Sequence, residues 1–270
     1  MSARAGRRAG VASVASFVFA SMLVSSPARA AFEWEHPSPE SWIAAESPYR
    51  WPIAEAGARS RVDLAAARPW SWSEVRASAV RAALGRPTWT AGLSLAQLAT
   101  GSYRETRLAG GWERRLGAQG LAVIASLVDV RAESARTIRV TGGELDLAWT
   151  SDLGWFRLRA AATGIVQSRG AVAVGVPRAL GVSVRSRGPG AQLAALFEEG
   201  SRGRRLVLGL TAPLGPLVLG AGWSTDEPSV RCLAGIRRGS LALTAGIAWH
   251  TELPPSQVIA LALVAREPEP

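Results

Sequence analysis

The sequence predicts an all-β protein, an antiparallel up-and-down transmembrane β-barrel of about 12 strands, within a range of roughly 10 to 14. Three observations predict this fold class. Beyond residue 85 apolar residues alternate with small or polar ones, clusters of turn-forming residues interrupt the alternation, and the uninterrupted segments hold about ten residues, enough for a tilted strand to cross a bilayer.

The alternation is clearest in 240–249, where Leu241, Leu243, Ala245, Ile247 and Trp249 share one face. Successive side chains of a strand point to opposite faces, so each such segment has one apolar face and one small or polar face. The expected strands are 88–97, 103–113, 120–130, 137–149, 155–165, 171–187, 190–198, 204–212, 216–223, 229–237, 240–249 and 256–264. Gly142-Gly143 is expected to form a bulge, and Pro177 to divide 171–187.

A soluble β-sandwich buries its apolar faces, whereas a membrane barrel turns them toward lipid. The length of the segments favours the barrel because sandwich strands usually hold five or six residues. The non-apolar face is rich in Gly, Ala, Ser and Thr, which suits a crowded interior. Short connections near 188–190, 213–215 and 238–239 also alternate with longer ones near 199–203, 224–228 and 250–255, as they do when hairpin turns fall on opposite sides of a membrane.

Tryptophans are expected to form an aromatic girdle at the membrane interface. They project from the apolar face and are Trp89, Trp112, Trp149, Trp223 and Trp249.

Charged side chains on the opposite face are expected to line the lumen: Arg107, Glu113, Glu144, Asp146, Arg157, Arg159, Arg185, Arg205, Arg231 and Arg237. A four-residue turn at 150–153 would place Asp146 opposite Arg157 and Glu144 opposite Arg159. Two interpretations stay open. The lumen is either filled by salt-bridged side chains or is a narrow pore whose arginine excess favours anions.

Residues 1–30 have the layout of a secretory signal peptide, with a basic start, an apolar stretch and the sequence Ala28-Arg29-Ala30, after which we expect cleavage. Residues 31–85 form a Pro- and Trp-rich arm, expected to be irregular and to lie in the periplasm or to plug the lumen; within it 73–85 fits a helix or a strand. The barrel is expected over 86–265, with a C-terminal tail at 266–270. This predicts a protein of the bacterial outer membrane.

The segment 216–264 resembles the closing hairpins of outer-membrane barrels of the long-chain fatty-acid transporter superfamily, particularly the relatives associated with type IX secretion. The resemblance rests on the turn 222–229, the strand 241–249 and the residues 250–253 before the last strand. It implies a barrel that usually has about fourteen strands. It also implies, as partners, a small hydrophobic ligand or a component of a secretion system.

Catalytic motifs are lacking in the sequence, which has no G-x-S-x-G, P-loop or H-E-x-x-H, one cysteine and two histidines, His36 and His250. We therefore expect no enzyme, catalytic residue, metal site or cofactor. The formal net charge is +10, and removal of four arginines with the signal peptide leaves +6 on an exported chain, a poor candidate for binding nucleic acid. The expected partners are the lipid bilayer and lipopolysaccharide. The expected role is structural, in assembly, or as a narrow passage; the alternatives are uptake of a small hydrophobic molecule and a soluble secreted or periplasmic β-sandwich that binds a partner.

Overall fold

The computed structural model describes residues 60–265, apart from 134–136, 189, 202, 226–228 and 252. The predicted signal peptide, the arm up to residue 59 and the C-terminal tail therefore lie outside the described residues. The strands are β1 (Arg61–Arg68), β2 (Arg76–Gly85), β3 (Trp89–Thr100), β4 (Tyr103–Leu116), β5 (Gln119–Glu133), β6 (Thr137–Leu153), β7 (Phe156–Gln167), β8 (Ala179–Ser186), β9 (Gln192–Gly200), β10 (Gly203–Leu214), β11 (Leu217–Ser224), β12 (Ser229–Arg238), β13 (Leu241–His250) and β14 (Ser256–Val264). Two short helices accompany them, η1 (Pro69–Ser71) and α4 (Arg169–Ala173).

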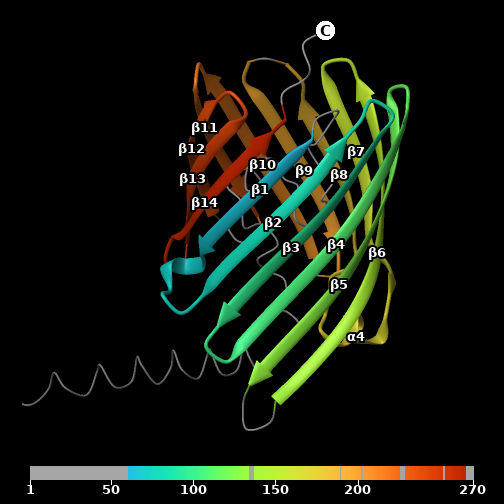
Figure 1. Ribbon diagram of the computed structural model, residues 1–270, viewed down its shortest axis with the longest axis vertical. Coiled ribbons are helices and arrows are strands. Elements are labelled where there is room, and N and C mark those ends of the chain that lie inside the picture. Colours follow the sequence, from blue (N-terminus) through green and yellow to red (C-terminus); the bar gives the residue numbers. More distant parts are fainter. Residues whose placement is uncertain are drawn as a thin grey trace, which may run out of the picture.

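The fold is a closed barrel in which every strand pairs antiparallel with its neighbours in sequence, and β1 closes the circle on β14. The closing register joins Arg61 to Val264 and Arg68 to Gln257. Figure 1 shows the strands steeply inclined around the barrel, with β1 (blue) lying beside β14 (red). The predicted fold class is thus confirmed, with a strand count at the upper end of the predicted range.

The two strands beyond the expected twelve come from the segment interpreted as an irregular arm. The prediction that the barrel begins at residue 86 is wrong, because β1 and β2 complete it from Arg61 onward. The strand interpretation of 73–85 is the correct one for β2. Both strands are rich in alanine, which has low intrinsic strand preference, so pairing with β14 and β3 decides their conformation.

The barrel has two different ends. The end at which β1 starts and β14 stops is called the terminal end. The opposite end is called the loop end. Four connections at the terminal end are two-residue turns, and each begins with a glycine of positive φ (Gly117, Gly154, Gly215 and Gly239, φ between 61° and 63°). Such turns need a left-handed first residue, which glycine adopts without strain. The loop end carries 69–75, 168–178 and 251–255, while the predicted long connection near 199–203 is a two-residue turn.

The predicted strand 171–187 is a strand only beyond Pro177, as β8, and its first part belongs to the connection 168–178. This connection holds α4, whose first turn is capped by the Ser168 hydroxyl accepting from the Ala171 amide at 3.3 Å. The helix packs on the inner face of β6 at Gly142, where a Cβ would lie 2.1 Å from the Ala171 nitrogen. Ala171, Val174 and Val176 bury against Val128 of β5. Part of the barrel's loop end is therefore covered from inside by this connection (Figure 1).

The predicted bulge at Gly142-Gly143 is also wrong, since the register of β5 with β6 runs through both residues without a shift. Gly142 instead makes room for α4. The irregularity in β6 lies further along, between Leu145 and Leu147 in its pairing with β7.

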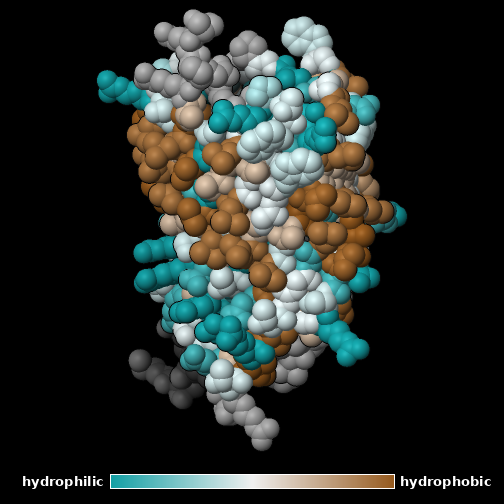
Figure 2. Space-filling view, turned by 45° about the vertical axis from the view of Figure 1, so that its right-hand side comes forward, coloured by the Kyte–Doolittle hydropathy of each residue, from teal (hydrophilic) through white to brown (hydrophobic). Residues whose placement is uncertain are grey.

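The two faces of the barrel wall carry different side chains, and the distribution is the reverse of that in a soluble protein. Large apolar residues such as Leu64, Leu93, Leu127 and Leu243 are 45–58% exposed on the outer face. Charged residues such as Asp63, Arg81, Arg107 and Asp146 are buried on the inner face. On the face that Figure 2 shows, a broad hydrophobic band crosses the middle of the barrel, with hydrophilic residues gathered toward both ends.

Candidate functional site

The charged interior of the barrel is the candidate functional site, and all ten side chains predicted for the lumen lie at inward-facing positions of their strands. Those that are buried are Arg107, Glu113, Glu144, Asp146, Arg159 and Arg231. Arg157, Arg185 and Arg205 are partly buried, and Arg237 is exposed near the terminal end.

One group of enclosed charges lies between β4 and β7. Arg107 of β4 forms an ion pair with Glu144 of β6, across β5, and its Nη2 also lies 3.4 Å from the Ser126 hydroxyl. The Glu144 side chain has no exposed surface. Asp146 accepts a hydrogen bond of 2.6 Å from the amide of Gly164. These charged side chains are therefore held in place by contacts with residues of the barrel strands.

A second group of charges lies toward the terminal end. Asp152 accepts from Arg157 at 2.7 Å and also pairs with Arg187 at 3.1 Å. Glu113 accepts from the Thr150 hydroxyl at 2.9 Å.

The predicted pairings of Asp146 with Arg157 and of Glu144 with Arg159 are wrong. In the observed register Asp152 faces Arg157 and Thr150 faces Arg159. The hairpin turns at Gly154, later than the expected turn, so every cross-strand partner moves along β6.

Among the inward charges that the sequence analysis missed are Arg61, Asp63 and Arg81, which lie on β1 and β2, outside the predicted barrel. The Arg81 Nε donates to Asp63 at 2.7 Å, and Arg61 pairs with the same carboxylate at 2.5 Å. The alternation of Val62 and Leu64 around Asp63 is the signal that could have located this strand.

Positive charge is concentrated on one side of the interior. Among the described residues of β8–β13, the inward-facing charges are Arg185, Arg205, Arg231 and Arg237 against a single carboxylate, Glu198, which faces Arg205. By contrast, β1–β7 carry inward acids at Asp63, Glu105, Glu113, Glu144, Asp146 and Asp152. The potential of the β8–β13 wall is therefore the more favourable one for an anion.

An apolar stretch interrupts the inner wall on the strands that meet at the closure. Ala67, Ala77, Leu233, Ala248 and Val258 form one buried cluster, joined by Leu98 and Val218. A second cluster of alanines adjoins it on β1, β2 and β14. The interior thus carries apolar patches beside the buried charges Asp63, Arg81 and Arg231 of the same strands.

His250 and Ser256 face the interior at the ends of β13 and β14. The His250 Nε2 lies 3.0 Å from the Ser256 hydroxyl, which bridges the connection 251–255. Ser256 has no exposed surface, so this contact closes a loop and presents no reachable nucleophile. The described residues contain no group of three or more potential metal ligands.

The five tryptophans expected in a girdle lie at outward-facing positions. Trp89, Trp112 and Trp149 are in the parts of β3, β4 and β6 next to the terminal end. Trp223 and Trp249 flank Val230 at the loop end of their strands. Cys232 also lies on the outer face and is partly buried.

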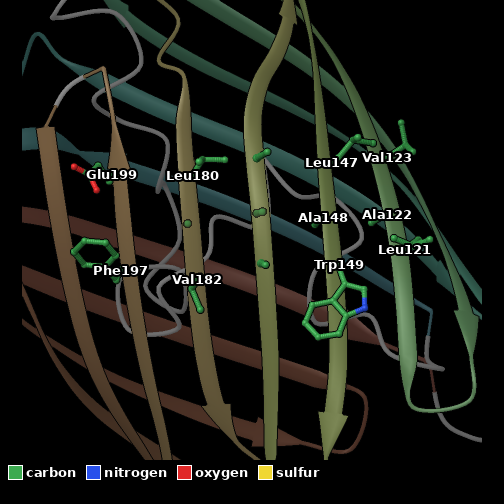
Figure 3. Close-up of a pocket in the computed structure, with 14 residues that line it drawn as sticks. Leu121, Ala122, Val123, Leu147, Ala148, Trp149, Leu180, Val182, Phe197 and Glu199 are labelled. Carbon is green, nitrogen blue, oxygen red and sulfur yellow. The ribbon is translucent and has the colours of Figure 1, made fainter.

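A groove of about 790 Å³ runs along the outer surface over β5–β9. Its floor is the small residues Ala160 and Ala162 of β7, and bulky residues such as Trp149 and Val182 rise on either side (Figure 3). The groove belongs to the apolar exterior and is separate from the charged interior. Within the described part of the chain, no helix is both long and apolar enough to cross a membrane.

No protein-family model and no curated protein matches the chain. Among solved structures it is similar in fold to porins. A triple mutant of the Rh. blastica porin aligns with a TM-score of 0.42 and 9% identity over 77% of this chain and 99% of the porin. A second triple mutant, of the Rhodopseudomonas blastica porin, aligns with a TM-score of 0.41 and 8% identity over the same shares. The narrower resemblance to fatty-acid transporter and type IX secretion barrels stays a prediction.

Proposed function

We propose that the protein is a non-enzymatic barrel of the bacterial outer membrane that forms a narrow passage favouring anions. The observation that carries the proposal is the distribution of side chains in a closed barrel, with large apolar residues exposed outside and charged residues enclosed within. Only a closed barrel satisfies all backbone hydrogen bonds of strands in lipid. A soluble protein of this size does not expose an apolar band around its whole circumference.

The anion preference follows from the β8–β13 wall, where arginines outnumber carboxylates among the described inward residues. Charged side chains that line a pore set its ion selectivity, and arginine favours anions. The chain is oriented with the terminal end toward the periplasm, because short turns of outer-membrane barrels lie there and longer loops lie outside.

Purified protein in a planar bilayer, with a potassium chloride gradient across it, tests the proposal. The expected result is small unitary currents whose reversal potential shows chloride to be the more permeant ion. Cation preference would contradict the anion passage, and the absence of any conductance would leave a purely structural barrel.

Uptake of a small hydrophobic molecule is the second candidate, and the apolar inner cluster around Leu233 favours it. A fluorescent fatty acid is a suitable probe. Binding that falls when Leu233 is changed to Ser, but not when the outward Leu243 is changed to Ser, would support uptake over ion passage.

A further inference from the structure

The outer surface of β1–β6 carries a line of arginines at the loop end, which we call the arginine row: Arg68, Arg76, Arg104, Arg131 and Arg139. The ladder joins four of them directly: Arg76 pairs with Ala99, Ala99 with Arg104, Arg104 with Arg131, and Arg131 with Arg139. Arg68 lies one position beyond the pair Ala67–Ala77 and so faces Arg76. All five are exposed.

Like charges in such register repel each other and destabilise a sheet. Asp129 offsets part of this repulsion, because its carboxylate accepts from Arg131 and from Arg139 at 2.8 Å each. Glu133 lies one position further out on the same face. Five arginines against these two acids leave a net positive charge at this edge.

Rows nearer the middle of the barrel change character in a fixed order. On the same outer face, one row closer to the middle of the barrel than the arginine row, the ladder joins polar residues: Ser78, Gln97, Thr106, Asp129 and Thr141. Within this polar row Gln97 donates to Thr106 at 3.3 Å. The next row is apolar, with Val80, Leu95, Leu108 and Leu127 in sequence across the strands. Hydrophilic side chains project below the hydrophobic band in Figure 2, at the end where β5 and β6 meet in Figure 1.

This order matches that of a phosphorylated lipid, in which a phosphate is followed by polar ester or amide linkages and then by acyl chains. Guanidinium groups bind phosphate oxygens in a bidentate manner, so arginine suits the outermost position. The opposite edge of the same wall is different. There the ladder runs Trp89, Arg114, Leu121 and Trp149, with one arginine between two tryptophans.

We infer that the arginine row binds phosphomonoester headgroups of the lipids that surround the loop end of the barrel. The inference rests on the proposed membrane location but not on ion passage. Repulsion within the row is relieved when phosphates lie between neighbouring guanidinium groups, and the acyl chains of the same lipids cover the apolar rows.

The test measures how phosphatidic acid, a lipid phosphomonoester, stabilises the barrel in neutral detergent micelles. The readout is the temperature at which the compact band of the unboiled protein disappears from a gel. Phosphatidylcholine and inorganic phosphate at equal phosphorus concentration are the reference additives. We expect phosphatidic acid alone to raise this temperature by several degrees in the wild-type protein.

The row variant carries Arg68→Gln, Arg76→Gln and Arg104→Gln, which avoids the two arginines paired with Asp129. A matched control carries Arg86→Gln, Arg114→Gln and Arg238→Gln, exposed positions at the terminal end. The concentration of phosphatidic acid needed for half the effect should rise about tenfold or more in the row variant, on the scale that three surface arginines contribute to anionic lipid binding. It should change less than about twofold in the control.

Equal behaviour of the two variants, or no rise in the wild-type protein, would overturn the inference. An equal effect of inorganic phosphate would assign the site to free phosphate and not to lipid. If the wild-type protein gives no compact band at all, the proposed membrane barrel is contradicted, and the inference about the arginine row with it. Conductance supplies an independent check, since it should be the same in the row variant and in the wild-type protein.

Discussion

Arg107 on β4 and Glu144 on β6 form an ion pair across the intervening strand, and both are buried inside the barrel. Their burial makes each dependent on the other, because a charge left without its partner in such a place must be desolvated without compensation. The pair therefore links three consecutive strands through their side chains as well as through the backbone ladder.

Replacing Arg107 by Met should destabilise the barrel by about 3 kcal/mol, since the carboxylate of Glu144 is left in a buried site. Urea unfolding in detergent, followed by tryptophan fluorescence, measures the free energy of unfolding. The double variant Arg107→Met/Glu144→Leu should recover part of this loss. The exposed pair Arg131–Asp129 is the comparison, and Arg131→Met should cost less than about 1 kcal/mol. Equal losses for Arg107→Met and Arg131→Met would contradict the account of the interior.

Gly142→Ala tests the contact between α4 and the wall. A Cβ there would lie 2.1 Å from the backbone of Ala171, whereas a Cβ on the adjacent Gly143 meets nothing closer than 3.6 Å. Gly142→Ala should cost about 1–3 kcal/mol or displace the connection 168–178, and Gly143→Ala should be close to neutral. Displacement is detected as a larger unitary current. If both variants behave like the wild-type protein, α4 does not pack where the structure places it.

Arg237→Glu and Arg238→Glu form a matched pair for ion selectivity. The two exposed residues are adjacent on β12, and Arg237 occupies an inward position whereas Arg238 occupies an outward one. Only the inward reversal should lower the ratio of chloride to potassium permeability, because only that charge faces the passage. The reversal potential in a potassium chloride gradient gives the ratio. A similar change in both variants would indicate a general surface effect.

Deletion of 31–59 examines the predicted plug without touching β1. If the arm occupies the lumen, the shortened protein should carry larger currents at the same voltage while keeping the heat stability of its compact form. Unchanged currents would count against a plug and favour an arm that lies in the periplasm.

The alternation of apolar and polar residues along single strands was enough to predict most of the fold. It depends only on the period of two and on which face is apolar. It located the hairpins from β3 to β14 and separated Arg205 from Leu206 or Arg231 from Cys232. Closure could not be derived in this way. The partner of β1 is about two hundred residues away in sequence (Arg61 faces Val264), and alanine-rich segments such as 76–85 fit a helix equally well when considered alone.

Register was the second limit. Moving the turn from 150–153 to Gly154 changes which charges meet, so Asp152 and not Asp146 faces Arg157. The connection 168–178 was missed for a related reason. Its apolar residues alternate like a strand, but Ser168 caps a helical turn that buries Val174 and Val176 against β5. Packing between distant segments decides both the register of the strands and the conformation of this connection. The residue pattern of one segment does not reveal that packing.

The central claim is that the apolar outer band faces lipid. The most direct test fractionates cells that express the full chain and compares unboiled with boiled samples on a gel. The account predicts a protein that leaves the membrane fraction only with detergent and migrates faster before boiling than after. Release by osmotic shock, with no difference in mobility between the two samples, would contradict it.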